Sequence, residues 1–161
     1  MFKNIFNKQA IAQEKKSALT IAFAHHKGGI GKTTSCLNVA GWLVKFGKKV
    51  LVIDFDPQGN ATTGLGVDRH SIDSSIYNVL FEHKDFNEII LETDSGVYLA
   101  PASLDLLAVE PQLINQADKT AILKKKLAEI QQYFDYILID TPPGSTLLMI
   151  NGIVAAENII I

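Results

Sequence analysis

The sequence predicts an α/β fold in three layers, with a mostly parallel sheet flanked by helices. Three short apolar runs have the length and composition of buried strands, and they cover residues 19–25, 50–54 and 136–140. Segments with helical periodicity and glycine-containing loops lie between them. This alternation of strand and helix is typical of parallel sheets with helices on both faces.

The composition describes one globular unit. The 161 residues fit one domain, which we divide into an N-terminal tail, residues 1–17, and an α/β domain, residues 18–161. The chain is 47% hydrophobic and 20% charged, and its net charge of -2 provides no overall attraction to nucleic acid. Its single cysteine, Cys36, excludes an internal disulfide and cysteine-rich metal sites.

The sequence argues against a membrane association. No stretch reaches the roughly 20 apolar residues that a membrane span needs. In the tail, Phe2, Ile5 and Phe6 fall at helical spacing between lysines. A short membrane-surface helix therefore stands as an alternative to an unpacked tail.

The first half of the domain predicts a right-handed βαβ unit. Apolar residues recur at helical spacing over residues 33–46, and Gly47 follows as a stop signal before the second strand. Residues 57–67 are rich in Gly, Asn and Thr and are expected to form a loop. A short helix is expected over residues 74–81, with Asp73 or Ser74 as its cap.

The second half is expected to continue the alternation. Helices are predicted at residues 85–91, 104–113, 119–133 and 145–156, and strands at residues 96–100 and 158–161. Lys124, Lys125 and Lys126 are interpreted as a solvated helix face. Because an apolar strand begins at the last residues, we expect the sheet to continue in a longer parent protein.

The loop after the first strand predicts a phosphate-binding site. Such a loop needs glycines that let backbone N–H groups approach an anion, a lysine for the β- and γ-phosphates, and a hydroxyl for Mg²⁺. These requirements are met by Gly28, Gly29, Gly31, Lys32 and Thr33. The helix that follows directs its positive end toward the phosphates. His26 stands where the standard pattern has glycine, and a second lysine, Lys27, precedes the glycines.

This deviant loop resembles that of the MinD/ParA superfamily, and two further segments resemble the ParA/Soj partition ATPases. The segment from Asp54 to Asn60 is similar to their D-x-D-P-Q-x-N stretch, and the one from Asp140 to Pro143 to their D-x-P-P stretch. Order and spacing also match, so the resemblance covers residues 19–161. It implies a P-loop NTPase fold and the binding of ATP with Mg²⁺.

The resemblance assigns roles to individual positions. Lys32 resembles the lysine of the β- and γ-phosphates, Lys27 the signature lysine that reaches the partner's nucleotide, and Asp56 the residue that positions the attacking water. The implied metal ligands are Thr33 and Asp140, with Asp54 as a helper near the metal. The implied nucleotide-binding residues are Lys27, Gly28, Gly29, Ile30, Gly31, Lys32, Thr33 and Thr34.

The function that the resemblance implies is a slow, Mg-dependent ATPase that switches a cytoplasmic homodimer in plasmid or chromosome partition. Its expected partners are a ParB-like centromere-binding protein and non-specific DNA, the latter through the C-terminal part of the complete protein. The ATPase would be nucleoid-associated when bound to DNA. Two alternatives are a related positioning ATPase of the MinD kind and a truncated, catalytically silent nucleotide-binding regulator.

Three departures from the family pattern stand out. His25 and His26 replace the polar pair, often Asn-Gln, that precedes the signature lysine, and we interpret them as strand-end residues without a metal site. Thr141 stands where the branch often has cysteine. The family's C-terminal part, with much of the adenine pocket and the DNA-binding surface, is not represented in these 161 residues.

Overall fold

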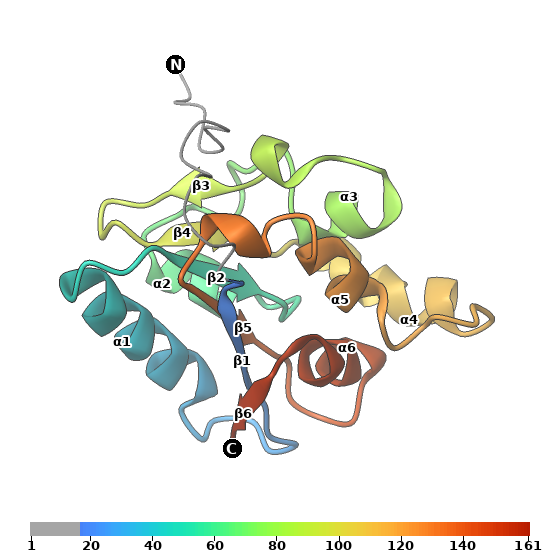
Figure 1. Ribbon diagram of the computed structural model, residues 1–161. Helices are drawn as coiled ribbons and strands as arrows, with labels where there is room; N and C mark the ends of the chain where they lie inside the picture. The colour runs from blue at the N-terminus through green and yellow to red at the C-terminus, as the bar shows by residue number, and fades with distance from the viewer. Residues whose placement is uncertain (1–16) are drawn as a thin grey trace.

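The computed structural model describes residues 17–161, and the alternative of a membrane-surface helix at Phe2, Ile5 and Phe6 falls outside that range. Within it, one sheet has the strand order β3-β4-β2-β5-β1-β6 (Figure 1). The strands are β1 (Leu19–Phe23), β2 (Val50–Asp54), β3 (Leu91–Glu92), β4 (Tyr98–Ala100), β5 (Tyr136–Asp140) and β6 (Asn158–Ile160). All neighbours run parallel except β3 and β4, which confirms the predicted mostly parallel α/β fold.

Helices cover both faces of this sheet. The α-helices are α1 (Lys32–Lys45), α2 (Asn60–Gly64), α3 (Ile76–Phe81), α4 (Val109–Leu113), α5 (Ile122–Leu127) and α6 (Leu147–Ala155). Single 3₁₀ turns are η2 (Phe86–Glu88), η3 (Leu104–Ala108) and η4 (Gln131–Tyr133). In the described part of the chain, no helix has both the length and the apolar character required to cross a bilayer.

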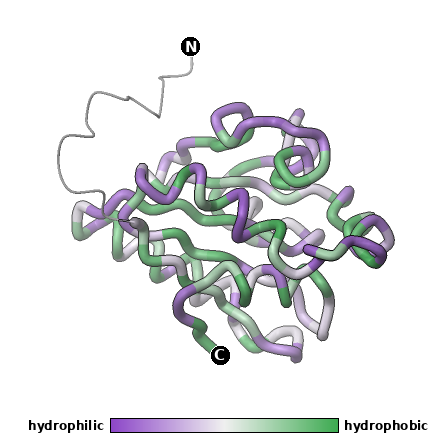
Figure 2. Tube along the Cα trace, turned by 45° about the vertical axis from the view of Figure 1, so that its right-hand side comes forward, coloured by the Kyte–Doolittle hydropathy of each residue, from purple (hydrophilic) through white to green (hydrophobic). Residues whose placement is uncertain are grey.

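The sheet separates two hydrophobic cores, because successive side chains of a strand point to opposite faces. Leu51 and Ile53 of β2 belong to the core shared with α3, α4, α5 and α6. Val50 and Val52 of the same strand belong to the core that contains Cys36 and other residues of α1 and α2. Figure 2 shows the strands as a largely hydrophobic centre with more hydrophilic segments around it.

The main elements were predicted correctly to within about two residues, but two predictions in the segment after β2 are wrong. The expected loop at residues 57–67 contains α2, which begins after Gly59 in a left-handed conformation with φ 66°. The cap of α3 is Ser75 and not Asp73 or Ser74, because the Ser75 hydroxyl accepts the Tyr77 N–H at 3.2 Å. Hydrogen bonds account for both differences, because Thr62 of α2 bonds to Asp54 of β2 and Tyr77 of α3 bonds to Ser75.

Three other helices are shorter than expected. The segment at 85–91 forms only η2 before joining β3, and the segment at 104–113 divides into η3 and α4. The segment at 119–133 is helical only from Ile122 to Leu127 and again in η4. Lys124 and Lys125 are exposed on α5, and Lys126 is half-buried.

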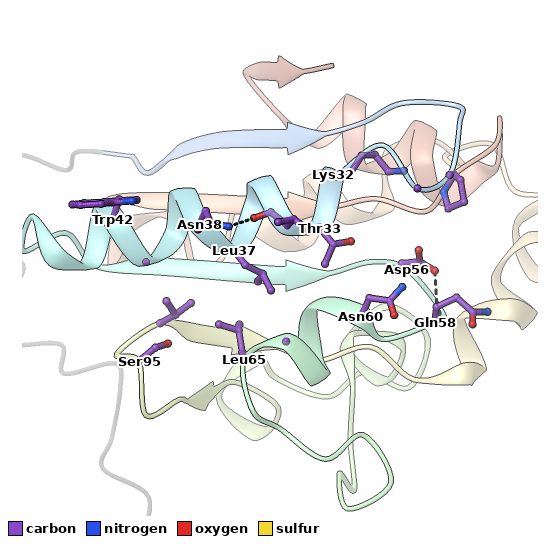
Figure 3. A pocket seen from close by; sticks show the side chains of 18 of the residues that line it. Lys32, Thr33, Leu37, Asn38, Trp42, Asp56, Gln58, Asn60, Leu65 and Ser95 are labelled. Atoms are coloured by element: carbon purple, nitrogen blue, oxygen red, sulfur yellow. Dashed lines mark hydrogen bonds between the residues drawn. The ribbon is translucent and has the colours of Figure 1, made fainter.

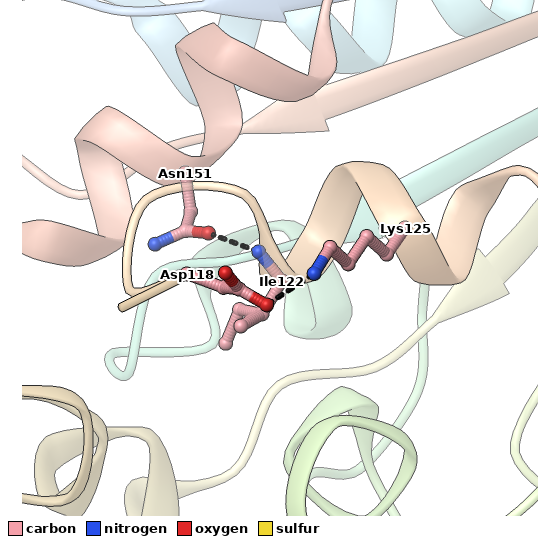
Figure 4. Close-up of polar contacts among 4 residues, drawn as sticks. All are labelled: Asp118, Ile122, Lys125 and Asn151. Atoms are coloured by element: carbon pink, nitrogen blue, oxygen red, sulfur yellow. Dashed lines mark hydrogen bonds and ion pairs between the residues drawn. The ribbon is translucent and has the colours of Figure 1, made fainter. Parts of the chain in front are cut away.

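The late start of α5 has a visible cause in α6. The buried side chain of Asn151 accepts the Ile122 N–H at 3.1 Å (Figure 4). It also donates to the Lys119 carbonyl at 2.7 Å. These bonds hold the chain before α5 out of a helical path. An ion pair between Asp118 and Lys125, also drawn in Figure 4, closes the same turn from the solvent side.

Candidate functional site

The glycine-rich loop connects the end of β1 to the start of α1. Gly29 and Gly31 adopt positive φ angles of 71° and 91°, a left-handed conformation that side chains disfavour. Gly31 is the residue before the first turn of α1, and no side chain caps that turn. The first backbone N–H groups of a 14-residue helix therefore point from the loop without a side-chain acceptor.

Hydrogen bonds bring the two predicted lysines of this loop together. Lys32 Nζ donates to the Lys27 carbonyl at 3.3 Å, and the Lys27 N–H donates to His25 Nδ1 at 3.0 Å. The His26 carbonyl accepts the Gly144 N–H at 2.9 Å, which ties the loop to the connection between β5 and α6. The backbone of Lys27 is thus held at both its N–H and its carbonyl.

The predicted carboxylates meet the loop at the carboxyl ends of two adjacent strands. Asp54 of β2 and Asp140 of β5 are register partners, as expected for parallel neighbours. Thr33 Oγ1, in the first turn of α1, donates to Asp140 Oδ2 at 2.6 Å. The other oxygen, Asp140 Oδ1, is buried and has no hydrogen-bond partner in residues 17–161.

Asp54 and Asp56 hold the segment after β2 in place. Asp54 Oδ2 accepts both the N–H and the hydroxyl of Thr62, each at 2.7 Å. Its Oδ1 accepts the Asp56 N–H at 3.3 Å, and Asp56 Oδ1 accepts the Gln58 N–H at 2.9 Å. Asp56 is 7% exposed, so one edge of its carboxylate reaches the surface beside the loop.

Sequence reasoning missed the part played by Thr62. Its hydroxyl donates to Asp54 and also accepts the Ala102 N–H at 3.1 Å, so it joins β2 to the segment after β4. The signal was present in the stretch that follows the two aspartates, where a hydroxyl side chain lies six residues after Asp56. We interpreted that stretch as a loop, and a loop gave no reason to expect a buried threonine.

Burial shapes the acidity of the two strand-end carboxyls. Desolvation raises the pKa of Asp140 to about 7, with smaller increases from the charges of Asp54 and Asp56 and a partial offset from the Thr33 hydrogen bond and Lys32. Desolvation also raises the pKa of Asp54 to about 6, against the lowering effect of its bonds to Thr62. A nearby divalent cation would favour the ionised form of both groups.

The donor atoms fit a hard divalent cation. The Thr33 hydroxyl and the Asp140 carboxylate, whose Oδ1 is buried and has no partner in the described residues, are the kind of oxygen ligands that Mg²⁺ takes. In the described residues, no group of three or more His, Cys, Asp or Glu side chains could hold a metal ion alone. The protein thus supplies few ligands, and phosphate oxygens and water would complete the shell, as is usual for Mg²⁺ with nucleotides.

A groove of about 990 Å³ runs from the loop along α1 (Figure 3). At one end lie six of the eight predicted nucleotide-binding residues, namely Gly28, Gly29, Gly31, Lys32, Thr33 and Thr34. Asp56 also lines the groove, together with Gln58 and Asn60. The sequence placed these last two in the D-x-D-P-Q-x-N stretch and predicted no separate role for them. Lys27 and Ile30 do not line the groove, and Ile30 is 47% exposed.

The chain is similar to known proteins over most of its length. A family model described as "AAA domain" matches residues 18–161. The chain is 40% identical over 143 residues to the chromosome-partitioning ATPase Soj of Treponema pallidum, a match that covers 88% of this chain and 55% of that protein. The chain spans about half the length of the curated relatives that it matches.

Solved structures share the same architecture. Cobyrinic acid a,c-diamide synthase from Mycobacterium smegmatis, with a bound ATP analogue and magnesium, superposes with a TM-score of 0.85 at 35% identity, over 88% of this chain and 58% of that one. A putative plasmid partition protein from Borrelia burgdorferi bound to AMPPNP has a TM-score of 0.78 at 30% identity, over 89% of this chain and 62% of that one.

Proposed function

This chain belongs to the AAA domain family, and from that premise we propose that it is the nucleotide-binding part of a ParA/Soj-type ATPase acting in plasmid or chromosome partition. In this proposal residues 18–161 form the ATPase domain and residues 1–17 a tail. The observation that carries it is the contact between Thr33 and Asp140 beside Lys32 at one end of the groove. A hydroxyl, a strand-end carboxylate, an ammonium and glycine amides are together what a magnesium–nucleotide complex requires.

The proposed binding mode uses residues 27–34 for the phosphates of ATP. Backbone amides and Lys32 Nζ would surround the β- and γ-phosphates, after Lys32 leaves the Lys27 carbonyl. Thr33 and Asp140 would hold Mg²⁺, with Asp140 acting through water and Asp54 supporting it from the adjacent strand. When bound, Mg²⁺ neutralises negative charge on the phosphate oxygens.

The proposed chemistry is the attack of water on the γ-phosphorus, which breaks the bond to the β-phosphate and yields ADP and inorganic phosphate. Asp56 would position the water and take its proton, because its carboxylate reaches the groove while one oxygen is fixed by Gln58. Lys32 would stabilise charge that develops on the phosphate oxygens. Turnover should be slow, because a switch that hydrolyses quickly cannot remain in its ATP state.

The proposed switch is a homodimer that forms with ATP and separates after hydrolysis. In it, Lys27 of each chain would reach the nucleotide of the other, which agrees with its place outside the chain's own groove. A ParB-like partner would promote hydrolysis, and the complete protein would bind DNA non-specifically on the nucleoid, in the cytoplasm. The similarity to proteins described as partition ATPases supports this assignment over a MinD-like positioning role.

Isothermal titration calorimetry on the 161-residue chain tests the proposal directly. ATP and ADP are titrated with Mg²⁺ and with EDTA, and phosphate release is followed separately. We expect magnesium-dependent binding of both nucleotides and slow release of phosphate. Binding without any turnover would favour a catalytically silent regulator, and the absence of binding to folded protein would refute the nucleotide site.

A further inference from the structure

His25 contacts the backbone of Lys27 through its ring. The Lys27 N–H donates to His25 Nδ1 at 3.0 Å, two residues along the chain. A neutral imidazole has one N–H donor and one acceptor nitrogen, so this contact requires the His25 proton on Nε2. A protonated ring has two donors and cannot accept the Lys27 N–H.

The other bonds of the loop converge on the same peptide. The carbonyl of Lys27 accepts Lys32 Nζ at 3.3 Å, so the His25 ring and the Lys32 ammonium hold opposite ends of one residue. The His26 carbonyl is fixed by Gly144, which leaves the peptide after His26 with little freedom to turn. The His26 carbonyl and the Lys27 N–H are the two sides of that one peptide, so Gly144 holds one side and the His25 ring the other, and loss of the His25 contact would leave the peptide held by Gly144 alone.

The charged and titratable neighbours of this contact are few. The His26 ring stacks on the His25 ring with a centroid distance of 4.5 Å. The connection at residues 141–146 and strand β6, which pack against the loop, contain no ionisable side chain. The loop itself carries Lys27 and Lys32, and Asp54 and Asp140 end the neighbouring strands. In the 161-residue chain, the terminal carboxylate of Ile161 follows Ile160, whose carbonyl accepts the Ala24 N–H.

We propose that His25 is a positioning residue for Lys27, and that its neutral ring holds the Lys27 peptide in the conformation from which the side chain acts. A side chain without an acceptor at this position leaves the Lys27 N–H without its partner, so the loop holds this conformation less firmly. The proposal rests on the proposed function for the consequence in turnover. The hydrogen bond itself is independent of any nucleotide.

Two substitutions separate the acceptor from the ring. An asparagine side chain accepts the N–H two residues along the chain, so His25→Asn keeps the contact without the imidazole. His25→Ala removes both. His26→Asn is the matched control, because it removes the neighbouring stacked ring and leaves the His25–Lys27 bond in place.

Nuclear magnetic resonance of the chain without nucleotide is the deciding measurement. Imidazole nitrogen shifts of the neutral His25 ring should report the Nε2–H form, as an acceptor at Nδ1 requires. Exchange of the Lys27 amide hydrogen with solvent should be slow in the parent, in His26→Asn and in His25→Asn, and faster in His25→Ala. A Lys27 amide that exchanges equally in the parent and in His25→Ala overturns the proposal, whatever the protein does with ATP.

Turnover gives the second readout wherever the parent hydrolyses ATP. His25→Ala should lower kcat by about 3- to 10-fold, as expected for one lost hydrogen bond, with KM changed less than twofold, and His25→Asn should restore it. Equal kcat values in the parent and in His25→Ala contradict the positioning role. A parent that binds no ATP contradicts the proposed function alone.

Discussion

Thr33 and Asp140 are 107 residues apart in the chain, yet their side chains meet in a hydrogen bond of 2.6 Å. One lies in the first turn of α1, the other at the end of the central strand β5, and the register of β1 with β5 brings these ends together. The contact joins the glycine-rich loop to the carboxylate edge of the sheet. Five predictions test the site that forms around it.

Removal of the loop ammonium should weaken nucleotide binding most strongly. Lys32→Ala deletes a cation at the phosphate end of the groove, and a charge-assisted hydrogen bond of this kind corresponds to roughly 10- to 100-fold in affinity. Calorimetry with ATP and Mg²⁺ measures the loss. Lys124→Ala, an exposed lysine on α5 outside the groove, is the control and should bind as the parent does. Equal affinities for both variants would contradict the assignment of Lys32.

The Thr33 hydroxyl should couple nucleotide binding to magnesium. Thr33→Val keeps the shape of the side chain but removes the donor to Asp140, so the ratio of ATP affinity in Mg²⁺ to that in EDTA should fall toward one. Thr33→Ser should retain the parent ratio, since it keeps the hydroxyl. The role fails if the valine and serine variants respond to Mg²⁺ alike.

Asp56 should act in turnover rather than in binding. Asp56→Ala removes the carboxylate proposed to position water, and such general-base contributions amount to about 100-fold or more in rate. Calorimetry should find ATP affinity within about threefold of the parent, while phosphate release slows. Asp94→Ala, an exposed carboxylate in the turn between β3 and β4, serves as the control. Parent-like turnover by the Asp56 variant would reject the assignment.

Lys27 should act on the nucleotide of the partner chain. Lys27→Ala alone should bind ATP but lose turnover by about 100-fold or more, as for other residues supplied in trans. Mixing it with Asp56→Ala gives dimers in which one site has both an intact Asp56 and a Lys27 from the partner. Phosphate release should therefore recover in the mixture. No recovery in a mixture that forms dimers would place the action of Lys27 within its own chain.

The buried Asp140 should make the fold less stable at high pH. Its pKa lies near 7 in the folded chain instead of the ordinary 3.8, so the folded state holds the proton more tightly than the unfolded state. The free energy of unfolding should accordingly decrease as pH rises from about 4 through 7. Asp140→Asn should be more stable than the parent at pH 8, by up to about 4 kcal/mol, and the difference should shrink below pH 7.

Urea unfolding of both proteins at pH 8 and pH 5.5, without Mg²⁺, measures this effect. Asp94→Asn is the matched control, since its exposed carboxylate should leave the pH dependence unchanged. A parent that gains stability between pH 5.5 and pH 8 relative to Asp140→Asn would show that the carboxyl is better stabilised than its burial indicates.

The sequence was most informative where burial is continuous. The strands at Val50–Asp54 and Tyr136–Asp140 were predicted to the residue, because a strand covered on both faces is apolar throughout and ends where polarity returns. The glycine-rich loop lies between β1 and α1 as predicted, and its binding of phosphate stays a prediction. The register that joins Asp54 to Asp140 also follows from two parallel neighbours.

The sequence was least informative where distant contacts set local structure. The helix α2 depends on the bond between Thr62 and Asp54, and the start of α5 depends on the Asn151 amide of α6. Thr62 stands within α2, but its bond to Asp54 depends on how the chain folds back on β2, and Asn151 lies outside the segment before α5 that it shapes. Edge strand β3 has only two residues, Leu91 and Glu92, which is too short for an alternating pattern to emerge.

Because the sheet divides the interior into two hydrophobic cores, a substitution in one core need not be compensated in the other. Ala40 of α1 and Leu127 of α5 belong to separate cores on opposite faces of the sheet. The effects of substitutions at these two positions on folding should add, as they do for sites without shared partners. The core packed under α3, α4, α5 and α6 can therefore be redesigned without repacking the core under α1, the helix that lines the groove.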